Sequence, residues 1–415
     1  MADHRLVYMF DGYTLNEPPI NENLFDNSVR FMNDVLNEKM GRFGKYIKEL
    51  DVARTYGEFV GSGAYGEVKT ICAGGVFFVI KSEQTSFNLF YVKPKPAIEA
   101  GNYFMTRFGV SYEDVVKYNP GFNEESTSVF IPAFLEPPTD TPDIFHELFI
   151  RTYITTNRIT PHVGRFEGMF LSNVERGKAT YSALMDSHWK TLATRKAEPK
   201  RFGYKQKIRY IIQALKAVEA LNAAGVLAHD CHDQNIMFDK RGDLLQTGVT
   251  HMLYDDGTLV KFDGRFVRMI DFGMSTLLYG DEAIGPSLYY SAEHTFVDTI
   301  LVLRAFEANS IISFVNEQLL QWAIEDRPER GSTAANRKMW LNVVGLKFDR
   351  TYKKHLDLKY VNDFKAYLSK ISAKWLLENC PELKSAIEKT KRTITDDAVV
   401  MSVEEIAATH PVVPC

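Results

Sequence analysis

Three closely spaced glycines constrain the fold of this chain most strongly, because runs of β-branched and aromatic residues flank them on both sides. They are Gly61, Gly63 and Gly66, within the segment 57–83. Glycine permits the backbone conformations of tight turns, whereas β-branched and aromatic residues favour strands. The pattern predicts three strands joined by two turns. Since no helix start follows the glycines, the segment does not fit a dinucleotide-binding strand–turn–helix unit.

Helix patterns dominate the rest of the chain and complete the fold class. The strongest lies over residues 208–221, where apolar side chains recur at spacings of 3, 4 and 7 and Gly225 follows as a stop signal. Further helices are expected from Asp143 and from about Thr295 onward, and the tail after Thr395 is expected to be frayed. Because a strand-rich part precedes a helix-rich part, we predict an α+β protein of two lobes.

Proline-bearing and polar stretches divide the chain further. The basic residues 188–203 are expected to form a connecting loop, and DDG and FDG turns predict a hairpin insertion. Short strands are expected at 163–171, 178–185, 236–238 and 266–270. The resulting parts are an N-terminal extension (1–55), a strand-rich lobe (56–187) with an irregular insertion (about 84–142), a helical lobe (188–310) with the hairpin insertion (about 240–264), and a helical C-terminal part (311–415).

Composition argues against several classes of protein. The 415 residues carry a formal net charge of −4, which argues against attachment to nucleic acid by bulk positive charge. Hydrophobic residues make up 45% of the chain, yet no run approaches the roughly 18 apolar residues of a membrane span. The four cysteines include no CxxC pair, and the N-terminus lacks the apolar run of a secretory signal. We expect a soluble cytoplasmic protein that binds neither nucleic acid nor membranes.

A lysine near the glycines is the first candidate for chemistry. Lys81 ends the apolar run Val79-Ile80, thirteen residues after Val68. A lysine at the end of a buried strand is costly unless an anion pairs with it. The glycine hairpin lets backbone N–H groups approach phosphate oxygens, so a lysine one hairpin later is placed to bind the same phosphates.

Two polar segments add candidate catalytic and metal-binding groups. In the segment 227–235, Asp230 could accept a proton from an attacking hydroxyl, and the Asn235 amide oxygen could bind a divalent cation. The tripeptide DFG at 271–273 directly follows an apolar run, where its carboxylate is a natural Mg²⁺ ligand. The histidines and aspartates of the first segment also suggest a transition-metal centre, but they lack HExxH or His-x-His spacing backed by cysteines.

The order of these features resembles the signature motifs of the protein kinase superfamily. A glycine hairpin, a strand lysine, D-x-x-x-x-N after a helix and DFG after a strand follow one another over roughly residues 56–310. The resemblance implies a two-lobed fold that transfers the γ-phosphoryl group of ATP with Mg²⁺ as cofactor. The leading interpretation is a divergent serine/threonine-type kinase, similar to those of large DNA viruses, that acts on protein substrates.

The resemblance also assigns roles to individual residues. Asp230 and Lys81 would be catalytic, and Asn235 and Asp271 would bind Mg²⁺. His232 stands where a lysine usually touches the transferring phosphate, so it would join the catalytic residues. The residues expected to bind ATP are Gly61, Ser62, Gly63, Ala64, Tyr65, Gly66, Val68 and Lys81.

Two glutamates compete to be the ion-pair partner of Lys81. Glu99 follows the lysine by 18 residues, close to the usual kinase spacing. Glu147 follows it by 66 residues but lies in the better amphipathic helix, DIFHELFIRTYI. The next segment, ITPHVGRFEGMFL, resembles the entry to the following strand in kinases of large DNA viruses. We therefore prefer Glu147.

Departures from the kinase pattern leave other functions open. His229 replaces the arginine of the HRD motif, no APE motif is present, and the best match to the structural aspartate of the next helix, Asp298, follows Asp271 by only 27 residues. The short intervening segment and His232 also suit a small-molecule kinase of the aminoglycoside or choline type. A pseudokinase scaffold is an alternative from another class, although it would not need both Mg²⁺ ligands. The insertion at 101–134 has a weak resemblance to a LysM glycan-binding module.

Overall fold

The protein is an α+β chain of several small sheets and helices, seen in a computed structural model. The N-terminal extension, Ala64, Tyr65, Glu99 and most of the insertion at 84–142 lie outside the described residues. The structure describes residues 58–63, 66–73, 76–86, 88–91, 128–131, 147, 150, 151, 153–155, 157–164, 166–175, 178–186, 190–198, 202–279, 282–284, 295–326 and 367–409.

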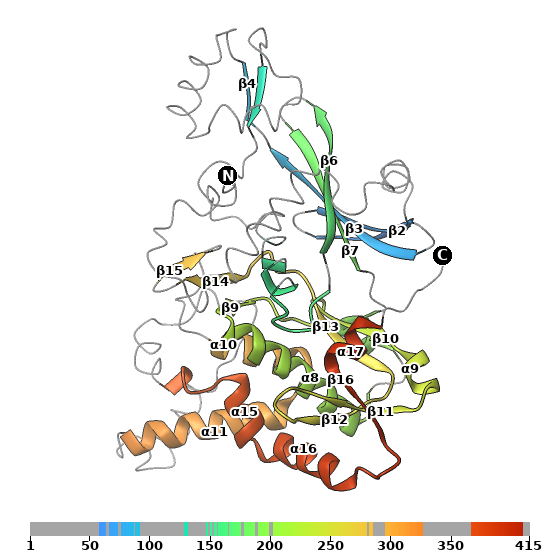
Figure 1. Ribbon diagram of the computed structural model, residues 1–415. Coiled ribbons are helices and arrows are strands. Elements are labelled where there is room, and N and C mark those ends of the chain that lie inside the picture. The colour runs from blue at the N-terminus through green and yellow to red at the C-terminus, as the bar shows by residue number, and fades with distance from the viewer. Residues whose placement is uncertain are drawn as a thin grey trace.

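A five-stranded antiparallel sheet lies above the helices in Figure 1. Its strands in spatial order are β1 (Glu58–Gly63), β2 (Gly66–Ala73), β3 (Val76–Ser86), β7 (Lys178–Asp186) and β6 (Phe166–Glu175). The three strands expected between 57 and 83 are therefore confirmed, and Gly63 pairs with Gly66 where the first hairpin turns. Since β3 is central, Lys81 has Val68 opposite it in β2 and Ala183 opposite it in β7.

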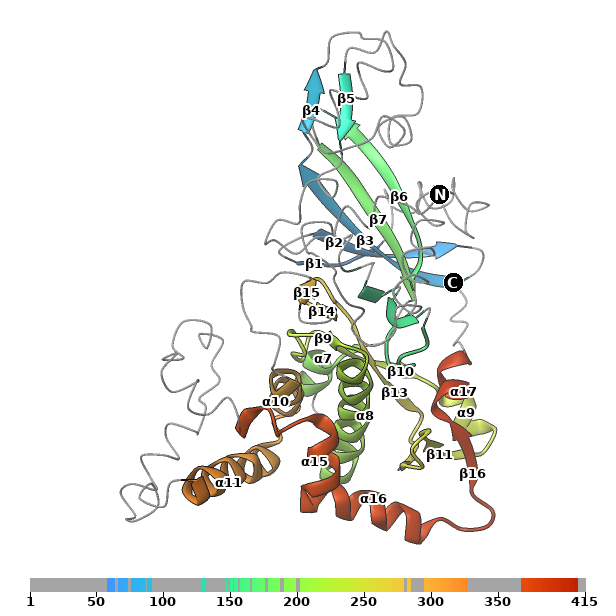
Figure 2. The ribbon, with the colours of Figure 1, turned by 60° about the vertical axis from the view of Figure 1, so that its left-hand side comes forward.

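The part of the molecule below this sheet in Figures 1 and 2 is mostly helical and packs around α8 (Tyr204–Ala223). Residues of α8 that recur at helical spacing, such as Ile208, Ile211 and Leu215, are buried. Helix α8 contacts α10 (Thr295–Ala305), α15 (Ala373–Asn379), α16 (Pro381–Thr393) and β13 (Arg265–Met269). The expected stop at Gly225 is confirmed, because this glycine adopts a left-handed φ of 77° just after the helix. The helices are α7 (Leu192–Ala197), α8 (Tyr204–Ala223), α9 (Gly242–Gln246), α10 (Thr295–Ala305), α11 (Asn309–Asp326), α15 (Ala373–Asn379), α16 (Pro381–Thr393) and α17 (Val403–Ala408).

Four smaller sheets complete the described structure. Their spatial orders are β13-β10-β8, β12-β11-β16, β15-β14-β9 and β4-β5. The strands are β4 (Asn88–Tyr91), β5 (Ser128–Ile131), β8 (Lys190–Thr191), β9 (Val226–Leu227), β10 (Ile236–Lys240), β11 (Val249–Leu253), β12 (Leu259–Lys261), β13 (Arg265–Met269), β14 (Thr276–Tyr279), β15 (Glu282–Ile284) and β16 (Val399–Ser402). The expected hairpin insertion is confirmed as β11–β12, preceded by the unexpected short helix α9. The strand expected from residue 163 starts only at Phe166, although Val163 makes an isolated bridge to Met269.

The connecting loop expected at 188–203 is wrong in part, because this segment contains β8 and α7. The Thr191 side chain caps α7 by accepting a hydrogen bond from the Thr194 backbone N–H at 3.1 Å, and Leu192 is fully buried. A threonine before a buried leucine is a helix-start signal. The charges of the segment obscured this short helix, which has only one buried hydrophobic side chain.

The frayed tail expected after Thr395 is also wrong. Strand β16 pairs in parallel with β11 of the hairpin insertion, and α17 follows directly. Ser402 and Glu405 form a reciprocal capping box at the start of α17. This motif satisfies two backbone donors at once and was readable as S-x-x-E. The strand pairing was not readable, because its partner lies about 150 residues earlier in the chain.

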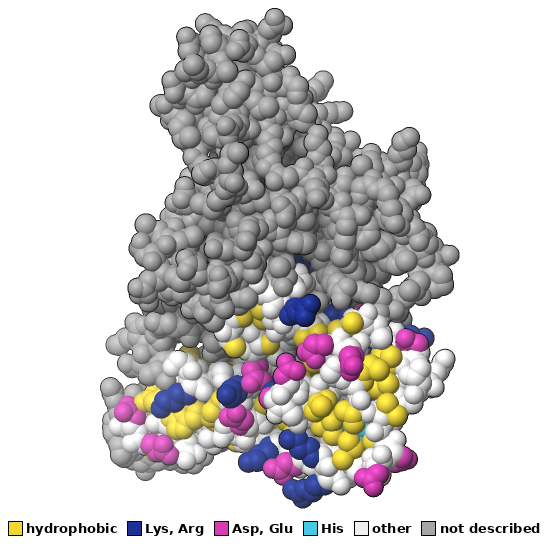
Figure 3. Space-filling view, viewed as in Figure 1, with side chains coloured by type: hydrophobic (Ala, Val, Ile, Leu, Met, Phe, Trp, Pro, Cys, Tyr) yellow, Lys and Arg dark blue, Asp and Glu magenta, His cyan; other side chains and the backbone are white. Residues whose placement is uncertain are grey.

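Charges of both signs are interleaved over the described part of the face in Figure 3. No single sign therefore dominates there. Within the described residues, no helix is both long and apolar enough to cross a membrane. The large hydrophobic side chains exposed among the described residues are Tyr204, Leu245, Leu253, Val399 and Val400.

Candidate active site

Lys81 joins three segments that are distant in the sequence. Its Nζ forms an ion pair with the carboxylate of Glu147 and lies 3.3 Å from Oδ1 of Asp271. The side chains of Lys81 and Glu147 are only 16% and 3% exposed. Burial opposes the charged ammonium, but the attraction of the two carboxylates outweighs it and raises the pKa of Lys81 above its ordinary value. Lys81 therefore stays charged throughout the physiological pH range.

Glu147 is held in place by the helical residues that follow it. Of these, Ile150 and Tyr153 are fully buried, and the Tyr153 hydroxyl donates to the carbonyl of Ala224 at 3.2 Å. The Nε of Arg151, one turn after Glu147, lies 3.7 Å from its carboxylate. Two cations thus offset the cost of burying this carboxylate.

The pairing of β10 with β13 places Asn235 and Asp271 side by side. Ile236 at the start of β10 is opposite Met269 at the end of β13, and the Ile270 N–H donates to the Asn235 carbonyl at 3.0 Å. Asp271 follows at once, with its side chain 45% exposed and its backbone in the left-handed region at φ 60°. Both expected Mg²⁺ ligands therefore lie at the same end of one strand pair.

Asn235 also organises the loop that carries Asp230. Its Nδ2 donates to the backbone carbonyl of Asp230 at 3.0 Å and to the Oδ2 of the same residue at 3.1 Å. The His232 Nε2 lies 3.5 Å from that Oδ2, and the His232 Nδ1 accepts the Gln234 N–H at 3.1 Å. The imidazole therefore faces the Asp230 carboxylate itself.

The backbone just before Asp230 is held by Asp298 of α10, which is fully buried. Its carboxylate accepts the backbone N–H groups of Ala228 at 2.8 Å and His229 at 2.7 Å, and the Asn222 amide at 3.2 Å. His229 adopts a left-handed φ of 59°. Such a conformation costs a non-glycine residue on the order of 1–3 kcal/mol, and it persists only where the surroundings determine it. Asp298 provides that constraint just before Asp230.

Helix α7 holds the loop from another side, which the sequence did not suggest. The Lys196 Nζ lies 2.9 Å from carboxylate oxygens of both Asp233 and Glu307, and the Ala193 N–H donates to the Asp233 carbonyl at 2.8 Å. Lys196 therefore positions the residue next to His232. Residues 188–203 were expected to form a loop, so this contact was not predicted.

The titrating groups of the loop respond differently to their surroundings. The hydrogen bond to Asp230 raises the pKa of His232 above 6.5 although burial opposes it, and the charges of Asp233 and Asp271 add to the effect. Burial raises the pKa of the adjacent Cys231 thiol well above its usual range. His232 is thus the group whose charge can change near neutral pH, whereas Cys231 stays an unreactive thiol.

The glycine hairpin lies in the same sheet as Lys81. Gly61 pairs with Val68 and Ser62 with Glu67, directly after a bulge between Phe59 and Gly61 in β1. Because Val68 is directly opposite Lys81, the two side chains lie on the same face of the sheet. The predicted nucleotide-contacting residues that the structure describes are therefore contiguous with the lysine.

The donor set at Asn235 and Asp271 suits a hard cation, since both residues offer oxygen ligands. Among the residues that the structure describes, no group of three or more His, Cys, Asp and Glu side chains is placed to hold a metal. Mg²⁺ does not require such a group, because it usually keeps several waters and binds one or two protein oxygens together with phosphates. The oxygen donors of Asn235 and Asp271 thus fit Mg²⁺.

Comparison with known proteins does not place the chain in a family. No family model matches it, and a search of the curated proteins returns no match.

The role of Asp298 generates a stability prediction. Asp298→Asn replaces a charged acceptor of three hydrogen bonds with an amide whose NH₂ group would face donors. The free energy of unfolding should fall by about 3 kcal/mol, because buried N–H groups lose their acceptor. Chemical denaturation measures this, with the exposed Asp396→Asn as the control. An equal, small effect of both substitutions would contradict the anchoring role.

Proposed function

We propose that the protein is an ATP- and Mg²⁺-dependent phosphotransferase. The observation that carries this proposal is the position of Lys81, paired with Glu147 and 3.3 Å from Asp271 beside the glycine hairpin. An ammonium oriented by one carboxylate, next to a second carboxylate that can bind a metal, is the arrangement that positions nucleotide phosphates in kinases. The resemblance in motif order supports the same activity and the two-lobed kinase-like fold.

The proposed reaction assigns one task to each residue. Asp230 accepts the proton of the acceptor hydroxyl, whose oxygen bonds to the γ-phosphorus as the bond to the ADP oxygen breaks. Lys81 neutralises charge on the α- and β-phosphates. Asn235 and Asp271 supply oxygen ligands to Mg²⁺, which when bound neutralises charge on the phosphates. Because these groups are held by strands and by Asp298, catalysis would come mainly from positioning.

The acceptor proposed first is a serine or threonine hydroxyl of a protein. A small hydroxyl-bearing molecule is the second candidate, because His232 faces Asp230 where protein kinases usually have a lysine. The short segment between Asp271 and Asp298 also leaves less chain for a peptide platform. A pseudokinase scaffold would bind nucleotide without transferring phosphate.

Transfer of label from γ-labelled ATP tests the function directly. With Mg²⁺, the purified protein should label either generic proteins or a compound in a metabolite panel, and the labelled class identifies the acceptor. Lys81→Ala should lower turnover on the order of 10²–10³-fold, because it removes charge stabilisation at the phosphates. The matched control is Lys69→Ala, since Lys69 lies in the adjacent strand β2, is 18% exposed and pairs with Glu67.

Three results would count against the proposal. Near wild-type turnover in Lys81→Ala would mean that the nucleotide site lies elsewhere. An equal loss in Lys69→Ala would mean that the sheet, rather than the phosphate contact, was damaged. Nucleotide binding without any transfer by the wild type would favour the scaffold.

His232 generates a prediction about pH. The imidazolium can stabilise the charge of the transferring phosphate, and the contact with Asp230 raises the pKa of His232 above 6.5. The charged form therefore predominates at pH 6.5 and is lost as pH rises through the raised pKa. We expect turnover at saturating ATP to decline across that range, and the decline to be absent in His232→Lys.

One hydrogen bond opposes this charge state. The added proton must enter at Nδ1, which accepts the Gln234 N–H, so charging the ring breaks that bond. Saturating Mg²⁺ is needed as a control, because ATP and Mg–ATP also titrate in this pH range. A thio-substituted nucleotide tests whether the chemical step limits the rate. If wild type and His232→Lys show the same pH profile, His232 only packs against the loop.

A further inference from the structure

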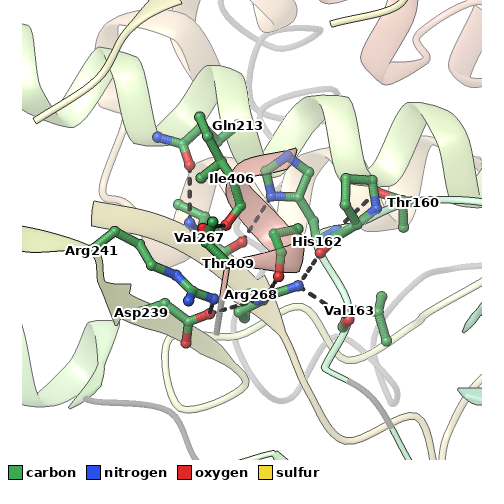
Figure 4. Close-up of polar contacts among 12 residues, drawn as sticks. Thr160, His162, Val163, Gln213, Asp239, Arg241, Val267, Arg268, Ile406 and Thr409 are labelled. Carbon is green, nitrogen blue, oxygen red and sulfur yellow. Dashed lines mark hydrogen bonds and ion pairs between the residues drawn. The ribbon is translucent and has the colours of Figure 1, made fainter. Parts of the chain in front are cut away.

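A buried polar network surrounds Arg268 of β13, and none of its residues takes part in the proposed reaction. It joins the segment 160–163, β10, β13 and α17 (Figure 4). Its charged members Arg268, Asp239 and Arg241 are 4%, 3% and 1% exposed. Burying such groups costs several kcal/mol each unless they are well paired.

Arg268 is the centre of this network. Its Nε lies 2.8 Å from Oδ2 of Asp239, and its Nη2 donates to the carbonyl of Ala407 in α17 at 3.3 Å. Its Nη1 donates to the carbonyl of Pro161 and, at 3.4 Å, to that of Val163. The planar guanidinium therefore links one carboxylate to three carbonyls from two other segments.

His162 and Tyr254 connect the same segment to the hairpin insertion. The His162 Nδ1 lies 2.8 Å from the Val267 carbonyl, so this nitrogen carries the proton. The Nε2 then accepts the Tyr254 hydroxyl at 3.0 Å. Burial lowers the pKa of His162 to about 3, so the ring stays neutral and this hydrogen-bond pattern does not change near neutral pH.

The segment 160–163 directly continues the helix that carries Glu147. Arg158 ends that helix in the left-handed conformation at φ 52°, and the Ile159 N–H donates back to the Ile154 carbonyl at 3.0 Å. The Met269 N–H then donates to the His162 carbonyl at 2.7 Å, two residues before Asp271. One end of this connection therefore leads to Glu147 and the other to Asp271, the two partners of Lys81.

We propose that Arg268 is a positioning residue for the Lys81 site. It clamps the segment 160–163 to β13, which sets the helix of Glu147 relative to Asp271, and α17 completes the clamp through Ala407. This inference rests on the proposed function for its effect on turnover, but its effect on Lys81 itself does not require any activity. It also gives the C-terminal segment and the hairpin insertion a role in supporting the site.

Arg241 offers a matched control within the network. Its Nη2 lies 3.1 Å from the same Asp239 oxygen, but within the described residues its side chain makes no hydrogen bond to the segment 160–163 or to α17. Its Nε and Nη1 are buried without a hydrogen-bond partner. Arg241→Met and Arg268→Met thus each remove one buried guanidinium from Asp239, and only the second removes the clamp.

The test measures acetylation of Lys81 in the full-length protein without nucleotide, read by mass spectrometry. The Lys81 amine is held against Glu147 and is only 16% exposed, so loss of that contact should free the amine for the reagent and raise the labelling rate several-fold. We expect faster labelling in Arg268→Met and wild-type labelling in Arg241→Met. Amide hydrogen exchange should be faster at 157–164 and 403–409 in Arg268→Met alone. Turnover with ATP should fall about tenfold in Arg268→Met alone, which is the size of effect expected of a residue that acts on a site through other residues.

The outcomes separate this inference from the proposed function. Faster Lys81 labelling in Arg268→Met, without phosphoryl transfer by the wild type, would support the clamp and reject the phosphotransferase. Equal changes in both variants would reduce Arg268 to a general stabilising residue and overturn the inference, as would unchanged Lys81 labelling or unchanged turnover in Arg268→Met. If Arg268→Met does not fold, Tyr254→Phe serves instead, because it removes only the hydroxyl bound to His162. Unchanged exchange at 157–164 in Tyr254→Phe would then overturn the clamp.

Discussion

The ion pair between Lys81 and Glu147 is the interaction on which the rest of this structure depends. An ammonium in the middle of a sheet would cost several kcal/mol if it were unpaired. Here Glu147 and Asp271 come from segments 66 and 190 residues away and offset that cost together. The pairing therefore ties the glycine hairpin, the helix of Glu147 and the end of β13 to a single point.

Strand pairing and a buried carboxylate fix the groups that lie around this ion pair. The pairing of β10 with β13 sets Asn235 beside Asp271, and Asp298 holds the backbone just before Asp230. His229 and Asp271 are two of the four non-glycine residues with a left-handed backbone among those that the structure describes. Conformations of this kind concentrate at functional sites, where the surrounding contacts offset their cost. Their positions beside Asp230 and the ion pair agree with a preorganised site.

Local chemistry made much of this arrangement predictable. Glycine spacing and β-branched runs predicted β1 to β3, and periodic apolar residues predicted α8, because both signals arise within a few residues. Glu147 could be preferred to Glu99 from its amphipathic helix, and Glu147 contacts Lys81. The contacts of Lys196 and Arg268 could not be predicted, because each joins elements far apart in the chain. The pairing of β16 with β11 could not be predicted for the same reason. The capping box of Ser402 and Glu405, in contrast, was a readable signal that the frayed-tail prediction overlooked.

Metal-dependent nucleotide binding tests the central claim most directly, since it needs no knowledge of the acceptor. Calorimetry would compare the affinity of wild type and Asp271→Asn for a non-hydrolysable ATP analogue, with and without Mg²⁺. A neutral amide is a poor substitute for a carboxylate on a hard cation. The account predicts that Mg²⁺ strengthens binding to the wild type and that Asp271→Asn loses this gain. The same Mg²⁺ dependence in both proteins, or no nucleotide binding by the wild type, would contradict it.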